Sequence, residues 1–302
     1  MSEPNTRSFF DPQVVARLSA LPLTARRPML GSVSGKHASP HRGASVEFAE
    51  YRKYVPGDDL RRLDWRAYGR CDRFYVKEFE ADTNLRMVLV VDTSGSMDFG
   101  SVGTTKLNYA RSVAATLSYL AIQQGDAVGL ACVADGIHQE IPPRRSASHV
   151  KTLMDTLSGA VPQGETGLET VLHELAETVR QRALIIVLSD MFIEPDAMRD
   201  CFEHLRFRKH DVSVFHLLDP EEIGFDFHRP TRFLDMEGGT AIFAEPTEIA
   251  DRYHDALSEY LTAVKKVSLE TAVDYRRVII DQPYEKVLTD FLVDRAFHRG
   301  KR

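Results

Sequence analysis

The chain has little of three features that would assign it to a common functional class. It has only three cysteines in 302 residues, Cys71, Cys132 and Cys201, which lie far apart and form no Cys-x-x-Cys pair. Such usage is typical of a reducing compartment and argues against a structural zinc site. Basic residues are not in excess either, because the formal net charge is −6. A nucleic-acid partner is therefore not expected, since binding to a phosphate backbone needs a basic surface.

Long hydrophobic runs are also missing. The longest ones, residues 87–91 and 183–188, are far shorter than the ~20 residues that a membrane-spanning helix needs. Near the start of the chain, Glu3, Pro4 and Asp11 stand where a signal peptide would place basic residues and then an apolar stretch. We therefore expect a cytoplasmic protein without a membrane span.

From residue 87 onward, apolar runs of strand length alternate with helical patterns. This alternation is typical of βαβ units, so we predict an α/β fold with a doubly wound, mainly parallel sheet. The first strand ends at Asp92 and has no polar alternation, as expected for a central strand. Expected strands are residues 87–91, 127–133, 183–188 and 212–218, with an antiparallel edge strand at 137–141 and a hairpin at 232–236 and 240–243; the main helices are 106–123, 195–207 and 248–266.

Three segments follow from these patterns. Residues 1–86 form an N-terminal extension that is rich in loops and contains a half-exposed strand at 75–79, and residues 87–266 form the α/β domain. Residues 267–302 form a C-terminal elaboration with a strand and then a helix.

The run Asp-Thr-Ser-Gly-Ser directly after the first strand is a candidate metal site. Asp92, Ser94 and Ser96 offer one carboxylate and two hydroxyls, and Gly95 allows the turn that brings their oxygens together. Magnesium prefers six oxygen ligands, so more distant oxygens are needed, and Thr166 and Asp190 follow later elements of the fold. The other interpretation of the run is a helix-capping turn that binds no ion.

These five residues, in this order, resemble the metal-ion-dependent adhesion site of von Willebrand factor type A domains, and the similarity covers about residues 87–245. The resemblance implies that the serines and the threonine bind Mg²⁺ or Mn²⁺, and that the aspartates bind it directly or through water. It further implies one open coordination position for a partner's carboxylate.

A second resemblance lies upstream. The segment Gly-Asp-Asp-Leu-Arg-Arg-Leu-Asp-Trp at residues 57–65, with Glu47 and Phe48 before it, is similar to the signature of the domain of unknown function 58 family. Its charged residues form either a solvated ion-pair cluster or a partner-binding surface, and the only tryptophan either anchors the segment on the core, which we favour, or is a contact hot spot. The candidate partner-binding residues are Asp58, Asp59, Arg61, Asp64 and Trp65.

The sequence favours binding over catalysis, because no nucleophile or general base accompanies the predicted metal. The family resemblance implies an adaptor or co-chaperone that works with a MoxR-type AAA+ ATPase. The alternative is a magnesium-dependent phosphotransferase of the haloacid dehalogenase type with Asp92 as nucleophile and Lys106 or Lys151 beside the phosphate. Such an enzyme wants a second carboxylate two residues after the nucleophile, where this chain has Ser94.

Overall fold

The computed structural model describes residues 9–25, 37–38, 47–55, 64–71, 73–80, 82–83 and 85–299. The chain divides into two compact units, one formed by residues 1–24 with 86–302 and the other by residues 25–85. Each unit is described by itself. Among the described residues, no helix is both long enough and apolar enough to cross a membrane.

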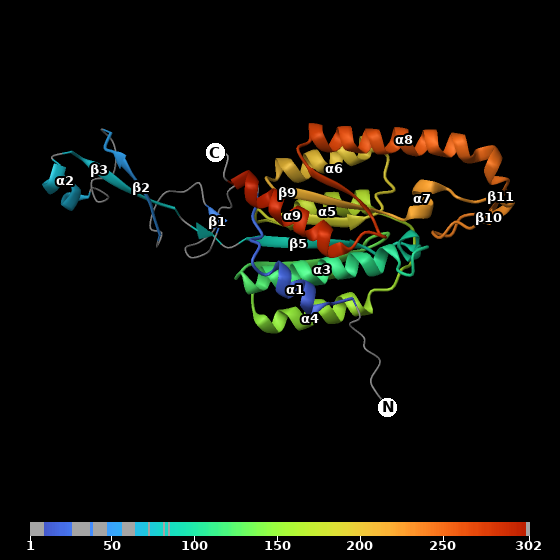
Figure 1. Ribbon diagram of the computed structural model, residues 1–302, viewed down its shortest axis with the longest axis horizontal. Coiled ribbons are helices and arrows are strands. Elements are labelled where there is room, and N and C mark those ends of the chain that lie inside the picture. Colours follow the sequence, from blue (N-terminus) through green and yellow to red (C-terminus); the bar gives the residue numbers. More distant parts are fainter. Residues whose placement is uncertain are drawn as a thin grey trace, which may run out of the picture. The chain divides into compact units, whose positions relative to one another are not determined.

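The larger unit is built on a six-stranded sheet (Figure 1). All neighbouring strands are parallel except the pair β6 and β7, which is antiparallel at one edge. Along the chain, the first strand of the sheet lies in its middle, the next strands run to one edge, and the later strands run to the other edge. One such reversal defines a doubly wound sheet and confirms the predicted fold class. The strands, in spatial order, are β12 (Asp274–Ile279), β9 (Asp211–Leu218), β8 (Leu184–Ser189), β5 (Arg86–Asp92), β6 (Ala127–Val133) and β7 (Ile137–Arg144).

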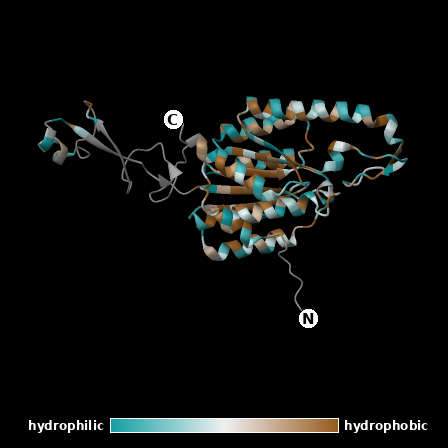
Figure 2. Cartoon of the chain, viewed as in Figure 1, coloured by the Kyte–Doolittle hydropathy of each residue, from teal (hydrophilic) through white to brown (hydrophobic). Residues whose placement is uncertain are grey.

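Helices cover both faces of the sheet, and the strands between them are coloured largely as hydrophobic (Figure 2). One face carries α1 (Pro12–Leu18), α3 (Lys106–Gln123), α4 (Ala147–Gly159) and α9 (Tyr284–Arg299). The other carries α5 (Leu168–Thr178), α6 (Pro195–Phe207) and α8 (Pro246–Glu270). Burial on both faces explains why β5 and β8 consist of nearly continuous apolar residues.

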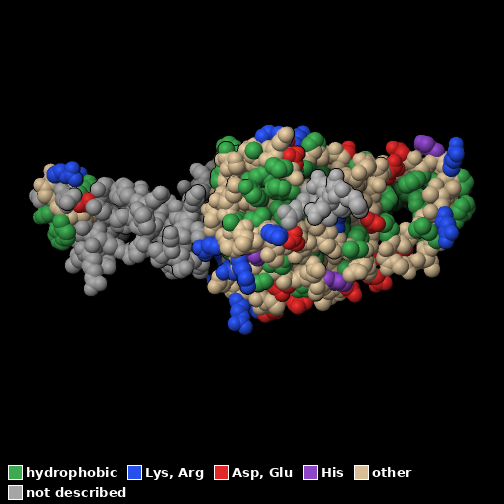
Figure 3. Space-filling model, turned by 90° about the horizontal axis from the view of Figure 1, so that it is seen from below, with side chains coloured by type: hydrophobic (Ala, Val, Ile, Leu, Met, Phe, Trp, Pro, Cys, Tyr) green, Lys and Arg blue, Asp and Glu red, His purple; other side chains and the backbone are tan. Residues whose placement is uncertain are grey.

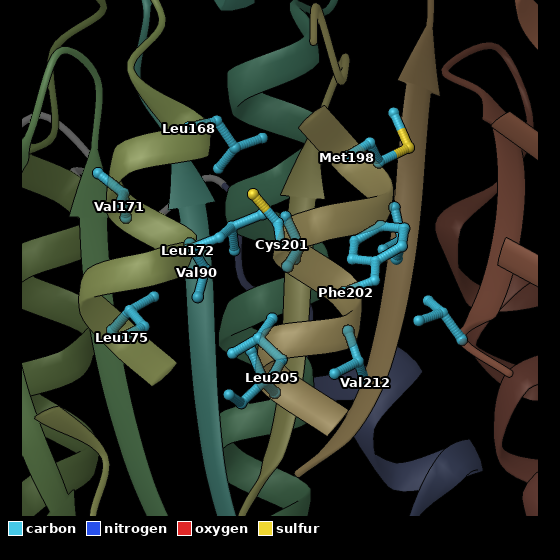
Figure 4. Close-up of a cluster of buried hydrophobic side chains, with 14 of the residues drawn as sticks. Val90, Leu168, Val171, Leu172, Leu175, Met198, Cys201, Phe202, Leu205 and Val212 are labelled. Atoms are coloured by element: carbon cyan, nitrogen blue, oxygen red, sulfur yellow. The ribbon is translucent and has the colours of Figure 1, made fainter. Parts of the chain in front are cut away.

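In the core on the second face, the alternating side chains of the strands pack against residues that recur at helical spacing. Val88 and Val90 of β5 point to the same side because strand side chains alternate, and they join a cluster with α5 and α6 (Figure 4). In α5 the inward residues recur at helical spacing. They are Leu168, Val171, Leu172 and Leu175.

A short hairpin and two short helices lie near the ends of the strands β5, β8 and β9. The hairpin pairs β10 (Thr231–Phe233) with β11 (Ile242–Ala244), and the helix α7 (Pro220–Gly224) follows β9 directly. The 3-10 turn η2 (Gly95–Asp98) follows β5. These irregular elements surround the carboxyl edge of the sheet.

The boundaries of the α/β unit differ from those expected from the sequence. Strand β12 joins the central sheet, so residues 267–299 belong to the same unit as the strands before them. Arg295 of α9 is fully buried, donates to the carbonyl of Thr24 at 2.7 Å and binds the Asp211 carboxylate of β9 at 2.5 Å. One buried guanidinium thus ties both chain ends to the sheet, a role that periodicity alone does not reveal.

Strand β7 is longer than expected. We expected Pro142 and Pro143 to end it, but the strand continues to Arg144. Proline is tolerated at the edge of a sheet, where one side of the strand needs no ladder hydrogen bonds.

The smaller unit contains the antiparallel pairs β1 (His37–Ala38) with β4 (Asp82–Thr83) and β2 (Glu47–Lys53) with β3 (Tyr75–Glu80), and the helix α2 (Trp65–Cys71). The Asp64 carboxylate accepts from the Ala67 amide at 3.2 Å, at the start of α2. The indole of Trp65 is 62% exposed and meets the ring of Tyr68 edge-on, so the expectation that it anchors the segment on the core is wrong.

Candidate functional site

The candidate site lies where the sheet order reverses, between the neighbouring strands β5 and β8. The carboxyl ends of two parallel strands that flank such a point form a crevice, which is where doubly wound folds bind ligands. Asp92 is the last residue of β5, and Asp190 follows the last residue of β8. The sheet therefore brings two aspartates from distant parts of the sequence to one edge.

Hydrogen bonds fix the Asp92 carboxylate between these strands. Its Oδ1 accepts from the Ser94 amide at 2.9 Å, and its Oδ2 accepts from the Ser189 hydroxyl at 2.6 Å. Burial, and then the negative charge of Asp190, raise the pKa of Asp92 to about 7. A bound cation would relieve both causes, since it replaces lost solvation and offsets the repulsion between the two carboxylates.

The two serines of the turn point their hydroxyls toward each other. Ser94 Oγ and Ser96 Oγ lie 3.1 Å apart and both residues are buried. Ser94 occupies the position before η2 but its side chain makes no capping hydrogen bond. The interpretation of this run as a side-chain capping turn is therefore not what the structure shows.

Thr166 lies in a loop that joins the turn after β5 through backbone hydrogen bonds. The Gly95 amide donates to the Gly164 carbonyl at 3.0 Å, and the Gln163 amide donates to the Thr93 carbonyl at 2.8 Å. The Gly167 amide closes the loop onto Ala134 after β6 at 2.6 Å. Thr166, which is half-buried, thus stands beside the loop that carries the two serines.

A lysine and a glutamate that the sequence did not assign to the metal site complete this crevice. The fully buried Lys106 ammonium lies 2.8 Å from Asp190 Oδ2 and 2.6 Å from Glu222 Oε1. Burial alone would lower the pKa of Lys106, but the charges of Asp190 and Glu222 outweigh burial and raise it. Lys106 is thus a permanent cation that neutralises one oxygen of Asp190.

The other oxygen of Asp190 has no such partner. Asp190 is 1% exposed, and its Oδ1 is buried without a hydrogen-bond partner among the residues that the structure describes. A buried carboxylate oxygen without a donor is costly, so this oxygen can accept a donor or cation that comes from outside the described residues.

The oxygens present fit a hard divalent cation. Two ligands that bind one Mg²⁺ at ~2.1 Å and at right angles lie ~3 Å from each other, close to the observed separation of the serine hydroxyls. Across the described part of the chain, no three His, Cys, Asp or Glu side chains form a metal-binding group. A cation here would therefore need hydroxyl ligands, which Mg²⁺ and Mn²⁺ accept and softer metals disfavour.

The crevice opens into an aromatic cavity of about 410 Å³. Met236 and Glu237 of the loop between β10 and β11 form part of its wall next to Ser96. Sequence reasoning missed this loop as part of the site, and its only signal is an acidic residue before Gly238 and Gly239. The aromatic wall consists of Phe99, Phe192, Phe225, Phe227, Phe233 and Tyr253.

The structure separates the remaining candidate residues. Asp64 is buried at the start of α2, and Trp65 is exposed beside it. The other predicted partner-binding residues, Asp58, Asp59 and Arg61, lie outside the described residues.

For the phosphotransferase alternative, Lys151 is exposed on α4 and Lys106 is already bound to two carboxylates. No finding supports that alternative.

The fold and site define an α/β protein with an oxygen-rich crevice at its topological switch point. The chain belongs to the family described as protein of unknown function DUF58, whose profile matches residues 50–259. It is 31% identical over 218 residues to the uncharacterized protein Rv1480 of Mycobacterium tuberculosis. The aligned region covers 70% of this chain and 68% of that protein.

Two solved structures are also similar. A conserved hypothetical protein BatB from Bacteroides thetaiotaomicron is 17% identical with a TM-score of 0.49, covering 70% of this chain and 99% of that one. The SpRpn10 VWA domain is 12% identical with a TM-score of 0.39, covering 68% of this chain and 94% of that one.

Proposed function

We propose that this protein is a non-enzymatic binding module in which a divalent metal orients an acidic residue of a partner protein. The observation that carries the proposal is the buried Oδ1 of Asp190, which has no hydrogen-bond partner among the described residues, at the same sheet edge as the paired hydroxyls of Ser94 and Ser96. The residues that would hold Mg²⁺ or Mn²⁺ are Asp92, Ser94, Ser96, Thr166 and Asp190.

The chemistry of this ligand set suits binding. Two aspartates and three hydroxyls leave at least one of six positions of an octahedral cation open, and a bound dication is a Lewis acid that a carboxylate can reach there. Ser94 stands where a phosphotransferase would place its general acid, and its hydroxyl is not acidic enough for that role. The crevice therefore supports recognition of a carboxylate better than group transfer.

The partner we propose is a MoxR-type AAA+ ATPase, for which this protein acts as an adaptor or co-chaperone in the cytoplasm. The support for the partner is the family resemblance, and the support for the compartment is the sparse, scattered cysteine usage. The Asp58 to Trp65 segment remains a second candidate contact, with the exposed indole of Trp65 at its end.

The test is an affinity purification of the intact chain with Mg²⁺ and with a chelator. We expect an AAA+ ATPase to be retained with Mg²⁺ and lost in chelator, and lost in both conditions with Asp92→Ala. A folded Asp92→Ala chain that retains the same partner in chelator would contradict the metal's role and favour the Asp58 to Trp65 segment.

A further inference from the structure

The loop between β10 and β11, residues 234–241, lies directly against the candidate metal site. A Cβ atom on Gly95 would stand 2.0 Å from the Met236 carbonyl oxygen, so glycine is required for this approach. Gly95 belongs to the turn that carries Ser94 and Ser96. The loop and the metal turn are thus in backbone contact.

This loop brings a carboxylate to the backbone of one proposed ligand. Glu237 Oε2 accepts from the Thr166 amide at 3.1 Å, and Thr166 is itself one of the proposed ligands. Glu237 Oε1 is buried and, within the described ranges, has no hydrogen-bond partner. Within the described part of the chain, one buried carboxylate oxygen of Asp190 and one of Glu237 therefore remain without a hydrogen-bond partner.

Local structure holds Glu237 in this orientation. Its amide donates to Asp235 Oδ1 at 2.8 Å, which forms a tight turn, and Gly238 has a φ of 102° that favours glycine. A Cβ on Gly239 would stand 2.0 Å from Asp235 Oδ2. The turn thus places the glutamate toward Thr166.

The charge balance of the crevice also favours a cation between these groups. Among the described residues that line the cavity beside Ser96 are four carboxylates, Glu221, Glu222, Asp235 and Glu237, and one ammonium, that of Lys106, so the formal charge of this lining is −3 when all are ionised. A dication would bring this close to neutrality. Binding of an acidic side chain from a partner would make the net charge of the site more negative again unless one of its own carboxylates moved away.

The loop side of the hairpin is loosely packed, although Phe233 at its base contacts the rings of Phe225 and Phe227. Leu234, Ile242 and Phe243 are 66%, 64% and 73% exposed. Hydrophobic side chains gather on the hairpin end of the unit in the space-filling view (Figure 3). Segments with few buried apolar contacts open at low cost.

We propose that Glu237 is an internal ligand, whose carboxylate fills the coordination position that the proposed function gives to a partner's acidic residue. The partner's carboxylate binds only by displacing Glu237 and its loop. The chain therefore holds its own site closed until a partner competes for it. This inference rests on the proposed metal-dependent function.

The test uses Mn²⁺ and the full-length chain. Binding is measured by electron paramagnetic resonance, and water proton relaxation reports the water molecules on the bound ion. The variant is Glu237→Gln, which keeps an oxygen for the Thr166 amide but removes the charge. Glu248→Gln, an exposed change of the same kind in α8, is the matched control.

We expect Glu237→Gln to weaken Mn²⁺ binding by about tenfold or more, in the range seen when metal-site residues are lost. Relaxation of water protons should rise, and added acetate should lower it in the variant but not in the wild type. Glu248→Gln should behave as the wild type. Should Glu237→Gln fail to fold, Glu237→Asp takes its place, because it shortens the side chain by one methylene.

The outcomes separate the two claims. If Asp92→Ala abolishes Mn²⁺ binding while Glu237→Gln changes neither affinity nor relaxation, Glu237 is only an acceptor for Thr166 and the inference is wrong. If the folded wild type binds no Mn²⁺, the proposed function fails and the inference fails with it.

Discussion

The buried ammonium of Lys106 provides the sharpest prediction about stability. Lys106 and Asp190 have side chains with no exposed surface, and the Glu222 side chain is only 18% exposed. Lys106→Met keeps the unbranched stem and removes the charge. Both carboxylates then remain in a poorly solvated crevice without their counter-ion, which is the situation in which removing one partner of a buried ion pair is most destabilising.

We expect Lys106→Met to lower the free energy of unfolding by about 3 kcal/mol in chelator, the lower end of the range for such changes, because Glu222 can regain some water. Urea unfolding followed by circular dichroism measures this loss. Lys265→Met, an exposed lysine on α8, should change stability by less than about 0.5 kcal/mol.

Metal should restore part of the lost stability. Without the Lys106 ammonium, the negative charge of Asp190 is no longer neutralised within the protein. Mg²⁺ should therefore stabilise Lys106→Met more than the wild type at the same concentration. A loss below about 1 kcal/mol in chelator, or no extra stabilisation by Mg²⁺, would refute this account of the ion cluster.

Three further predictions concern the partner, the chemistry and acid stability. Thr166→Ala should weaken Mg²⁺-dependent partner binding by about 1 to 3 kcal/mol while the fold is kept, as a pull-down with circular dichroism can show. Purified protein should not hydrolyse an aryl phosphate, and turnover that Asp92→Asn removes and Ser94→Asp increases would instead indicate an enzyme. Burial, and then the charges of Arg182 and Arg208, lower the pKa of His210 to about 4, so the unfolded state takes up the proton first as the pH falls. Stability should therefore drop by up to about 1.4 kcal/mol per pH unit from pH 6.5 to 4, and His210→Gln should reduce that slope in urea titrations.

The central sheet was largely predictable because its strands carry a strong signal. The run before Asp92 is apolar at every position, which only a strand covered on both faces requires, and the helix from Lys106 to Gln123 has the boundaries expected from its periodicity. The short helices α1 and α2 were missed, since seven residues give too few turns for a period to appear. The place of residues 267–299 in the central unit was missed because it depends on tertiary contacts, the pairing of β12 with β9 and the burial of Arg295.

The candidate site was predictable in part for the same reason. Asp92 and Asp190 end two apolar runs, so parallel pairing alone brings them together. Lys106 and Glu222 meet through tertiary packing across 116 positions of sequence, for which neither residue carries a local signal. Glu237 lies in a turn whose place depends on the contact between Gly95 and Met236, which no pattern of residues reveals.

Direct measurement of Mn²⁺ or Mg²⁺ binding to the purified chain tests the central claim. Calorimetry on the wild type should show one weak site for Mg²⁺ or Mn²⁺, and folded Asp92→Ala should lose it. Tight binding of Zn²⁺ together with no heat and no thermal shift for Mg²⁺ or Mn²⁺ would contradict the ligand set of hydroxyls and carboxylates.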